Sequence, residues 1–260
     1  MTMVLKLFGA LFSMSLRRSL AFRADLLFEL VMTLVGAGAA VAALGVVYTR
    51  TDTLAGWSPG EAIALLGTFQ LVSGLRTAFV EPNLQWFGDQ VKSGRFDAIL
   101  LQPAPSMFLA SLATCTPAAL VQVALGIGIT AAGVIQAEVT LTVAGVASWL
   151  ILVVAATVTM WATRIALASV VFWALGLNLD ILYDAVWQFG RYPVQVYRST
   201  LQSVLTYVVP VALLATVPVD ALRDGSFVAV PAAVVVAAGT STAAWVIWRR
   251  GLRRYTSATS

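Results

Sequence analysis

Long apolar runs alternate with short polar connections along most of the chain. A helix needs about 20 apolar residues to cross a hydrocarbon core of about 30 Å, and several runs reach that length. The pattern predicts an all-α polytopic membrane protein with six transmembrane helices. Five of the expected spans have clear bounds, at residues 26–48, 61–80, 107–135, 201–219 and 226–248.

The remaining span falls in residues 140–177, which are apolar for longer than one crossing requires and include Trp161 and Arg164. Either a long tilted helix or a span followed by an interfacial helix fits such a run. We expect the second arrangement, with Arg164 as an anchor at the membrane surface. The polar stretch 178–200 follows, with aromatic residues suited to the interface.

The first residues mix bulky apolar side chains with basic ones. Residues 4–23 carry Arg17, Arg18 and Arg23 on a pattern typical of an amphipathic helix that lies on a membrane surface. The first turns of the first span are the alternative interpretation. We expect residues 1–25 to form a surface helix that precedes spans one and two in residues 26–80.

The longest polar interruption is residues 81–106, between the second and third spans. Its apolar residues recur at roughly helical intervals among the charged ones, which predicts a short amphipathic helix. Pro103 and Pro105 end it, because proline cannot continue a helix. A helix between two spans keeps one polar face free for a partner.

Prolines and a capping residue mark further helix bounds. Ser58 followed by Pro59 and Glu61 predicts the start of the second span. Pro117 predicts a kink in the third span and Pro210 a bend in the fifth.

Composition supports a membrane protein and excludes several kinds of site. Hydrophobic residues make up 60% of the 260 residues and charged residues only 11%, against about 25% charged in soluble domains. The sequence has no histidine and one cysteine, Cys115, so we expect no disulfide, no metal site and no catalytic centre. It also has no GxxxxGK[ST] motif, so we expect no nucleotide or other cofactor in this chain.

The net charge of +4 reflects basic residues in connections beside the spans, which predicts membrane topology and not nucleic-acid binding. With both termini in the cytoplasm, twelve of the sixteen lysines and arginines lie in inner segments. Arg50 and Arg223 are the only ones expected outside. The inner set is Lys6, Arg17, Arg18, Arg23, Lys92, Arg95, Arg191, Arg198, Arg249, Arg250, Arg253 and Arg254.

Three polar residues inside the second span share one helix side. Gln70, Ser73 and Arg76 are spaced three residues apart. They are predicted either to face a translocation path or to form hydrogen bonds between helices.

The order of these features resembles the ATP-binding cassette (ABC) type-2 permeases, over nearly the whole chain. The features are six spans, a basic N-terminal helix, the pattern SGRFDAILLQP between spans two and three, and FGRYPVQVY before the fifth span. The likeness is nearest to short bacterial exporter permeases without a fused ATPase. Their G-x-x-D-x-x-L-x-x-P pattern matches Gly94, Asp97, Leu100 and Pro103.

The resemblance implies a single transmembrane domain, with residues 107–248 forming spans three to six and residues 249–260 a basic cytoplasmic tail. It further implies a multi-pass protein of the cell's inner membrane that pairs with a second permease subunit. A separate nucleotide-binding ATPase subunit that holds ATP and magnesium would dock on residues 81–106. Its ATPase-coupling contacts would be Gly94, Arg95, Phe96, Asp97, Leu100 and Pro103.

The expected function is therefore export of an amphiphilic compound, such as a drug, toxin or lipid-like molecule.

Two kinds of alternative remain. For Arg95 and Asp97, an exposed salt bridge of about 0 to 1 kcal/mol is the alternative to docking. A membrane-embedded lipid-modifying enzyme or a non-ABC carrier is the alternative for the whole chain. The enzyme is disfavoured because the carboxylates are not expected to cluster at one membrane depth. The carrier is disfavoured because every carboxylate falls at a loop or a span end.

Overall fold

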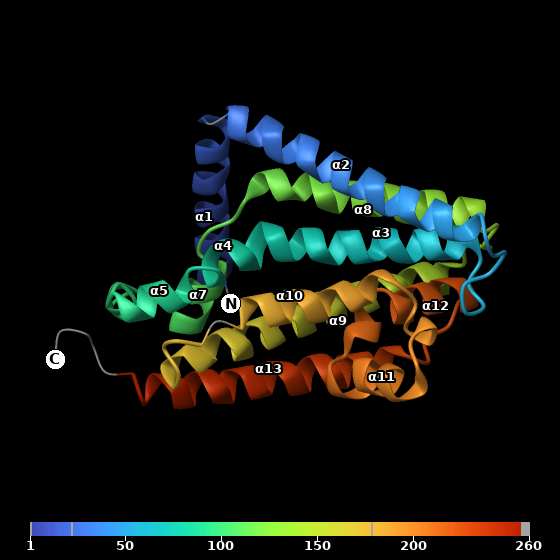
Figure 1. Cartoon of the computed structure of the whole chain (residues 1–260). Helices are drawn as coiled ribbons and strands as arrows, with labels where there is room; N and C mark the ends of the chain where they lie inside the picture. The colour runs from blue at the N-terminus through green and yellow to red at the C-terminus, as the bar shows by residue number, and fades with distance from the viewer. Residues whose placement is uncertain (1, 22, 178, 256–260) are drawn as a thin grey trace.

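The computed structural model describes residues 2–21, 23–177 and 179–255, which are helical and include no strand. Long helices lie side by side in a bundle, and α1 (Thr2–Ala21) crosses one end of it (Figure 1). The long helices are α2 (Arg23–Tyr48), α3 (Pro59–Leu75), α8 (Leu120–Gln136), α9 (Val143–Ala168) and α13 (Val230–Leu252).

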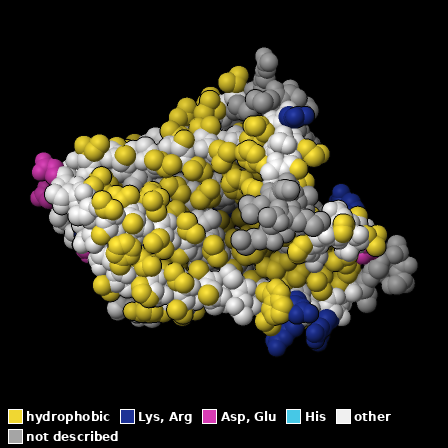
Figure 2. Space-filling view, turned by 180° about the vertical axis from the view of Figure 1, so that it is seen from behind, with side chains coloured by type: hydrophobic (Ala, Val, Ile, Leu, Met, Phe, Trp, Pro, Cys, Tyr) yellow, Lys and Arg dark blue, Asp and Glu magenta, His cyan; other side chains and the backbone are white. Residues whose placement is uncertain are grey.

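Five helical stretches in this part of the chain are long and apolar enough to cross a membrane. Figure 2 shows apolar side chains over most of one face, with charged ones toward its edges. The protein is therefore an all-helical, multi-pass membrane protein. The five stretches are Leu30–Tyr48, Pro59–Lys92, Pro117–Gln136, Val143–Phe172 and Val230–Leu252.

The bundle has two ends, which we name after residues of the second span. Glu61 lies in the first turn of α3, and Glu81 follows the π-helical turn Arg76–Val80 that continues it. Ser58 caps α3 as expected, because its side chain accepts from the Glu61 amide and Glu61 accepts from the Ser58 amide. The C-terminal end of α13 lies at the Glu81 end, where Trp248 contacts Phe87.

The predicted fifth span, residues 201–219, is wrong as a continuous helix. Residues 180–224 run the length of the bundle once. Asp180 pairs with Arg164 at the Glu81 end, and Arg223 pairs with Glu61 at the other end. The crossing consists of short helices, and Pro210 prevents those on either side of it from joining into one helix. They are α10 (Asp180–Gln188), η4 (Phe189–Arg191), η5 (Val194–Val196), α11 (Ser199–Ser203), η6 (Val204–Val208), η7 (Val211–Leu214) and α12 (Thr216–Asp224).

The third span is broken where a kink was expected at Pro117. It consists of α7 (Ser106–Leu112), the turn η2 (Pro117–Ala119) and α8. Irregular backbone at membrane depth needs partners within the protein. The Asn83 side chain bonds the backbone N–H and C=O of Thr114, and the Thr116 amide donates to the Ala78 carbonyl.

The expectation of a short span plus an interfacial helix in residues 140–177 is also wrong. Helix α9 and the turn η3 (Ser169–Phe172) form one stretch of 30 residues. Arg164 is only 2% exposed inside it, so it is not an anchor at the membrane surface. Two carboxylates neutralise its charge. Arg164 can therefore lie inside the span, and the helix does not have to end at the membrane surface to expose it.

Helices α3 and α8 pack so closely that glycines are required between them. A Cβ added to Gly67 would collide with the Thr130 backbone, and one added to Gly126 with the Leu71 backbone. Gly60 and Gly133 form equivalent contacts toward the Glu61 end. Small residues allow such close approach of helices in lipid, and this pair forms the rigid centre of the bundle.

Candidate functional site

Residues 81–106, which we call the coupling segment, form three short helices and not the single amphipathic helix expected. They are α4 (Glu81–Leu84), α5 (Phe87–Lys92) and α6 (Asp97–Leu100). Gly94 separates α5 from α6 with a φ of +72°, a left-handed conformation that glycine adopts without strain. The turn folds α6 back toward the bundle.

An aromatic cluster anchors the coupling segment to two transmembrane helices. Phe87 and Phe96 of the segment lie 5.3 Å apart, and both pack on Phe172 at the end of α9. Trp248 of α13 lies 5.4 Å from Phe87, and Tyr255 lies 5.3 Å from Phe96. Edge-to-face rings contribute about 0.5 to 1.5 kcal/mol each beyond their buried area, so the cluster holds the segment firmly.

The cluster changes the role expected of Phe96. Its side chain is 0% exposed, so it does not contact a partner in this conformation. Asp97 approaches Tyr255, whose pKa is raised by burial and then by this carboxylate. Other residues of the segment are exposed, and they include Trp86, Asp89, Lys92, Arg95, Leu100, Leu101 and Pro103.

A charge cluster joins the start of the coupling segment to α9 and α10. Arg164 lies 3.2 Å from Glu81 and 2.9 Å from Asp180. Arg76 lies 2.7 Å from Asp184 and 3.5 Å from Glu81. The carboxylates therefore do gather in space, contrary to the expectation, but around two arginines; no group suited to a metal ion occurs among the described residues.

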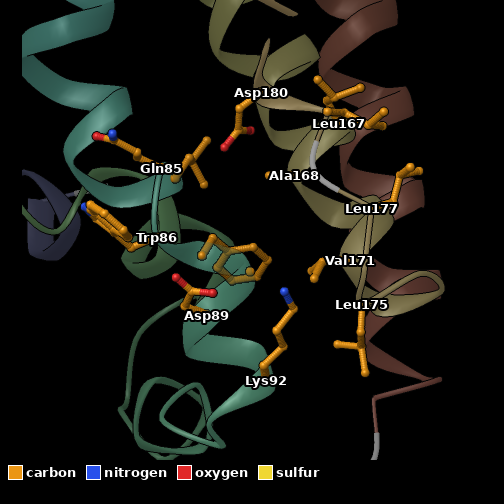
Figure 3. A pocket seen from close by; sticks show the side chains of 14 residues that line it. Gln85, Trp86, Asp89, Lys92, Leu167, Ala168, Val171, Leu175, Leu177 and Asp180 are labelled. Atoms are coloured by element: carbon orange, nitrogen blue, oxygen red, sulfur yellow. The ribbon is translucent and has the colours of Figure 1, made fainter. Parts of the chain in front are cut away.

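A groove of about 150 Å³ opens between the coupling segment and the connection from α9 to α10 (Figure 3). Asp89 and Lys92 of α5 line one side of it. Leu175 and Leu177 line the other, where both are about half exposed. The groove combines charged and apolar groups at the Glu81 end.

The polar residues of the second span bond to neighbouring helices. Gln70 accepts from the Gln122 side chain of α8 at 3.0 Å. Ser73 accepts from the Trp187 indole of α10 at 3.0 Å. Arg76 belongs to the charge cluster, so all three form the interhelical contacts that were one of the two alternatives.

Helix α1 is separate from the first span and crosses the Glu81 end. Phe8 and Phe12 contact Phe79, at 5.7 and 6.4 Å between ring centroids. Arg17 is exposed, as a surface helix requires. The side chains of Arg18 and Arg23 lie outside the described part of the structure.

The comparison with known families agrees with this arrangement. A family model described as ABC-2 family transporter protein matches residues 34–259. The chain belongs to this ABC-2 transporter family. Neither the curated proteins nor the solved structures give a match.

Permeases of this family normally work with an ATPase subunit. The sequence interpretation missed two features at the Glu81 end, the charge cluster and the aromatic cluster from Phe87 to Tyr255. A signal for the first was present: Arg164 lies within a long apolar run, where an arginine requires a partner. The sequence does not identify that partner as Glu81.

Proposed function

We propose that this chain is the membrane-spanning permease subunit of an ABC exporter, in which an ATPase subunit docks on the coupling segment and drives export of an amphiphilic compound. One observation carries the proposal. The coupling segment is fixed to α9 and α13 through buried rings, and Glu81 pairs with Arg164, which in turn pairs with Asp180 of α10. Its other side exposes apolar and charged residues. Movement of the segment would therefore be transmitted to these helices.

The docking surface in this proposal consists of Leu100, Leu101, Pro103 and Arg95, with Gly94 and Asp97 shaping the turn. Leu101 is 86% exposed and Leu100 is 40% exposed. Exposed leucines at the end of a membrane bundle favour a protein contact, because burying their apolar surface against a partner removes it from water. Arg95 would fix the register of the partner by its charge.

We expect Leu101→Asp to reduce co-purification of the ATPase subunit at least about tenfold, because a buried charge in an interface core costs more than 1.4 kcal/mol. Export should fall equally while the amount of permease in the membrane stays unchanged. Val228→Asp is the matched control: it changes an 87% exposed valine at the Glu61 end. Equal losses in both variants, or none in either, would refute docking at this surface.

The proposal places both termini and the coupling segment in the cytoplasm of a cell with an inner membrane. The distribution of basic residues favours this orientation, although two residues expected inside no longer count. Arg191 lies beside Phe69 in the bundle, and Arg198 follows it on the way to the Glu61 end. The proposed assembly also contains a second permease subunit, which the exposed faces of α2 and α13 would accommodate.

Labelling from outside the cell tests the orientation. In a Cys115→Ser background, Val228→Cys should react with an impermeant maleimide, while Ser93→Cys should react only after the membrane is opened. Both positions are exposed and lie at opposite ends of the bundle, so accessibility of the thiol is matched. The reverse labelling pattern would contradict the proposed topology.

A further inference from the structure

Arg191 lies at mid-depth of the bundle, with its side chain exposed on the surface of the chain. Its guanidinium lies 5.8 Å from the centroid of the Phe69 ring. Phe69 stands at the middle of the helical stretch from Pro59 to Val80. A charge at the bilayer centre costs about 2.5 to 3.5 kcal/mol on insertion scales, so such positions are functional.

Within the described part of the chain, Arg191 takes part in none of the ion pairs, in contrast to Arg76 and Arg164. All carboxylates of the sequence belong to connections, to the broken fifth crossing near its ends, or to residues near the ends of long helices. A second copy in the same orientation would present its carboxylates at these same two levels. It would therefore not neutralise Arg191. The twelve carboxylates of the sequence are Asp25, Glu29, Asp52, Glu61, Glu81, Asp89, Asp97, Glu138, Asp180, Asp184, Asp220 and Asp224.

Arg191 borders a cavity of about 340 Å³ between α2 and the rest of the bundle. Small side chains of α2 form one wall, which gives the cavity an apolar surface beside the single cation. Tyr192 adds a phenol at the same edge. The walls include Gly36, Ala39 and Ala43 on α2, and Leu66, Arg191 and Tyr192 opposite.

We propose that this cavity binds an amphiphile through its anionic group, a carboxylate, phosphate or sulfonate, which pairs with Arg191 while the apolar body lies against α2. The planar guanidinium binds two oxygens of such a group at once. The inference rests on the proposed exporter function and narrows its substrate class to anionic amphiphiles. It assigns the neutralising charge to the ligand, because no carboxylate of the described part of the chain pairs with Arg191.

The test measures binding to the full-length permease alone, in nanodiscs of phosphatidylcholine. The probes are dansylaminoundecanoic acid and its methyl ester, which share the fluorophore and apolar body and differ in the charge. We expect the acid to bind about tenfold more tightly than the ester, as a charged hydrogen-bonded pair provides. Arg191→Gln should abolish this preference, and Arg191→Lys should retain most of it.

Two matched controls separate the site from general effects. Arg198→Gln removes an exposed arginine that does not border the cavity and should leave the preference intact. Gly36→Leu should block both probes by filling the cavity, whereas Gly38→Leu should not. Neither glycine has an atom within 4 Å of an added Cβ, so neither change brings its Cβ against the backbone of another helix.

Equal binding of acid and ester to the wild-type permease would overturn the proposal, as would a preference that persists in Arg191→Gln. Added phosphatidylglycerol distinguishes two sources of the anion. If it displaces the acid in an Arg191-dependent manner, the site is supported and its occupant is a bilayer lipid. If it does not, the site belongs to a free amphiphile. Because no ATPase is present, failure here leaves the exporter function standing, and failure of ATPase docking leaves this binding measurable.

Discussion

Gly126→Val is expected to prevent the bundle from folding. The added side chain would collide with the backbone of Leu71 and the carbonyl of Gly67. Backbone cannot yield as a flexible side chain does, so α3 and α8 would have to separate along their length. The free energy of unfolding should fall by more than the cost of ordinary overpacking, which is about 1 to 3 kcal/mol. Fluorescence-detected size-exclusion chromatography should show aggregate in place of a monodisperse peak.

Gly128→Val is the control for this prediction. It places the same side chain on the same helix two residues further, where an added Cβ meets no atom within 4 Å. Both variants replace glycine by valine on the same helix, so the effect on helix propensity is common to both. A difference between their elution profiles therefore reports the contact of α8 with α3. Similar elution profiles for the two variants would contradict the close packing described for α3 and α8.

Arg164→Leu is expected to destabilise the protein by about 3 to 5 kcal/mol, because breaking a buried ion pair leaves its partner charges uncompensated. Here those partners are Glu81 and Asp180. Since they belong to the coupling segment and α10, ATP-driven export should fall further than the amount of folded permease. Thermal unfolding in detergent and export in the same cells measure the two effects.

Arg223→Leu provides the comparison at the Glu61 end. Arg223 has three carboxylates within ion-pair distance, against two for Arg164, but its side chain is 36% exposed. Exposed pairs contribute about 0 to 1 kcal/mol, so this change should cost little. Replacing Glu81 and Asp180 by Gln and Asn in Arg164→Leu should restore part of the stability. No restoration would mean that Arg164 acts through packing and not through its charge.

The sequence determined the class of protein and most helices, because these depend on local properties. A run of apolar residues long enough to cross a membrane folds as a helix wherever it lies, since lipid leaves backbone groups no other partner. The bounds at Ser58, Tyr48 and Gln136 follow from capping and polar residues beside such runs. Residues 81–106 stand out for the same reason, as the longest polar interruption.

Only the tertiary structure decided how the charged and aromatic residues are used. Arg164 and Glu81 are 83 residues apart, so nothing local distinguishes an interfacial anchor from a buried ion pair. Phe96 is buried by Phe172 and Tyr255, which the chain brings from other helices. The broken fifth crossing likewise depends on packing against α3 and α9, and it places Arg191 at mid-depth. The cost of a charge or an open backbone group depends on its neighbours in space, and folding alone sets those neighbours.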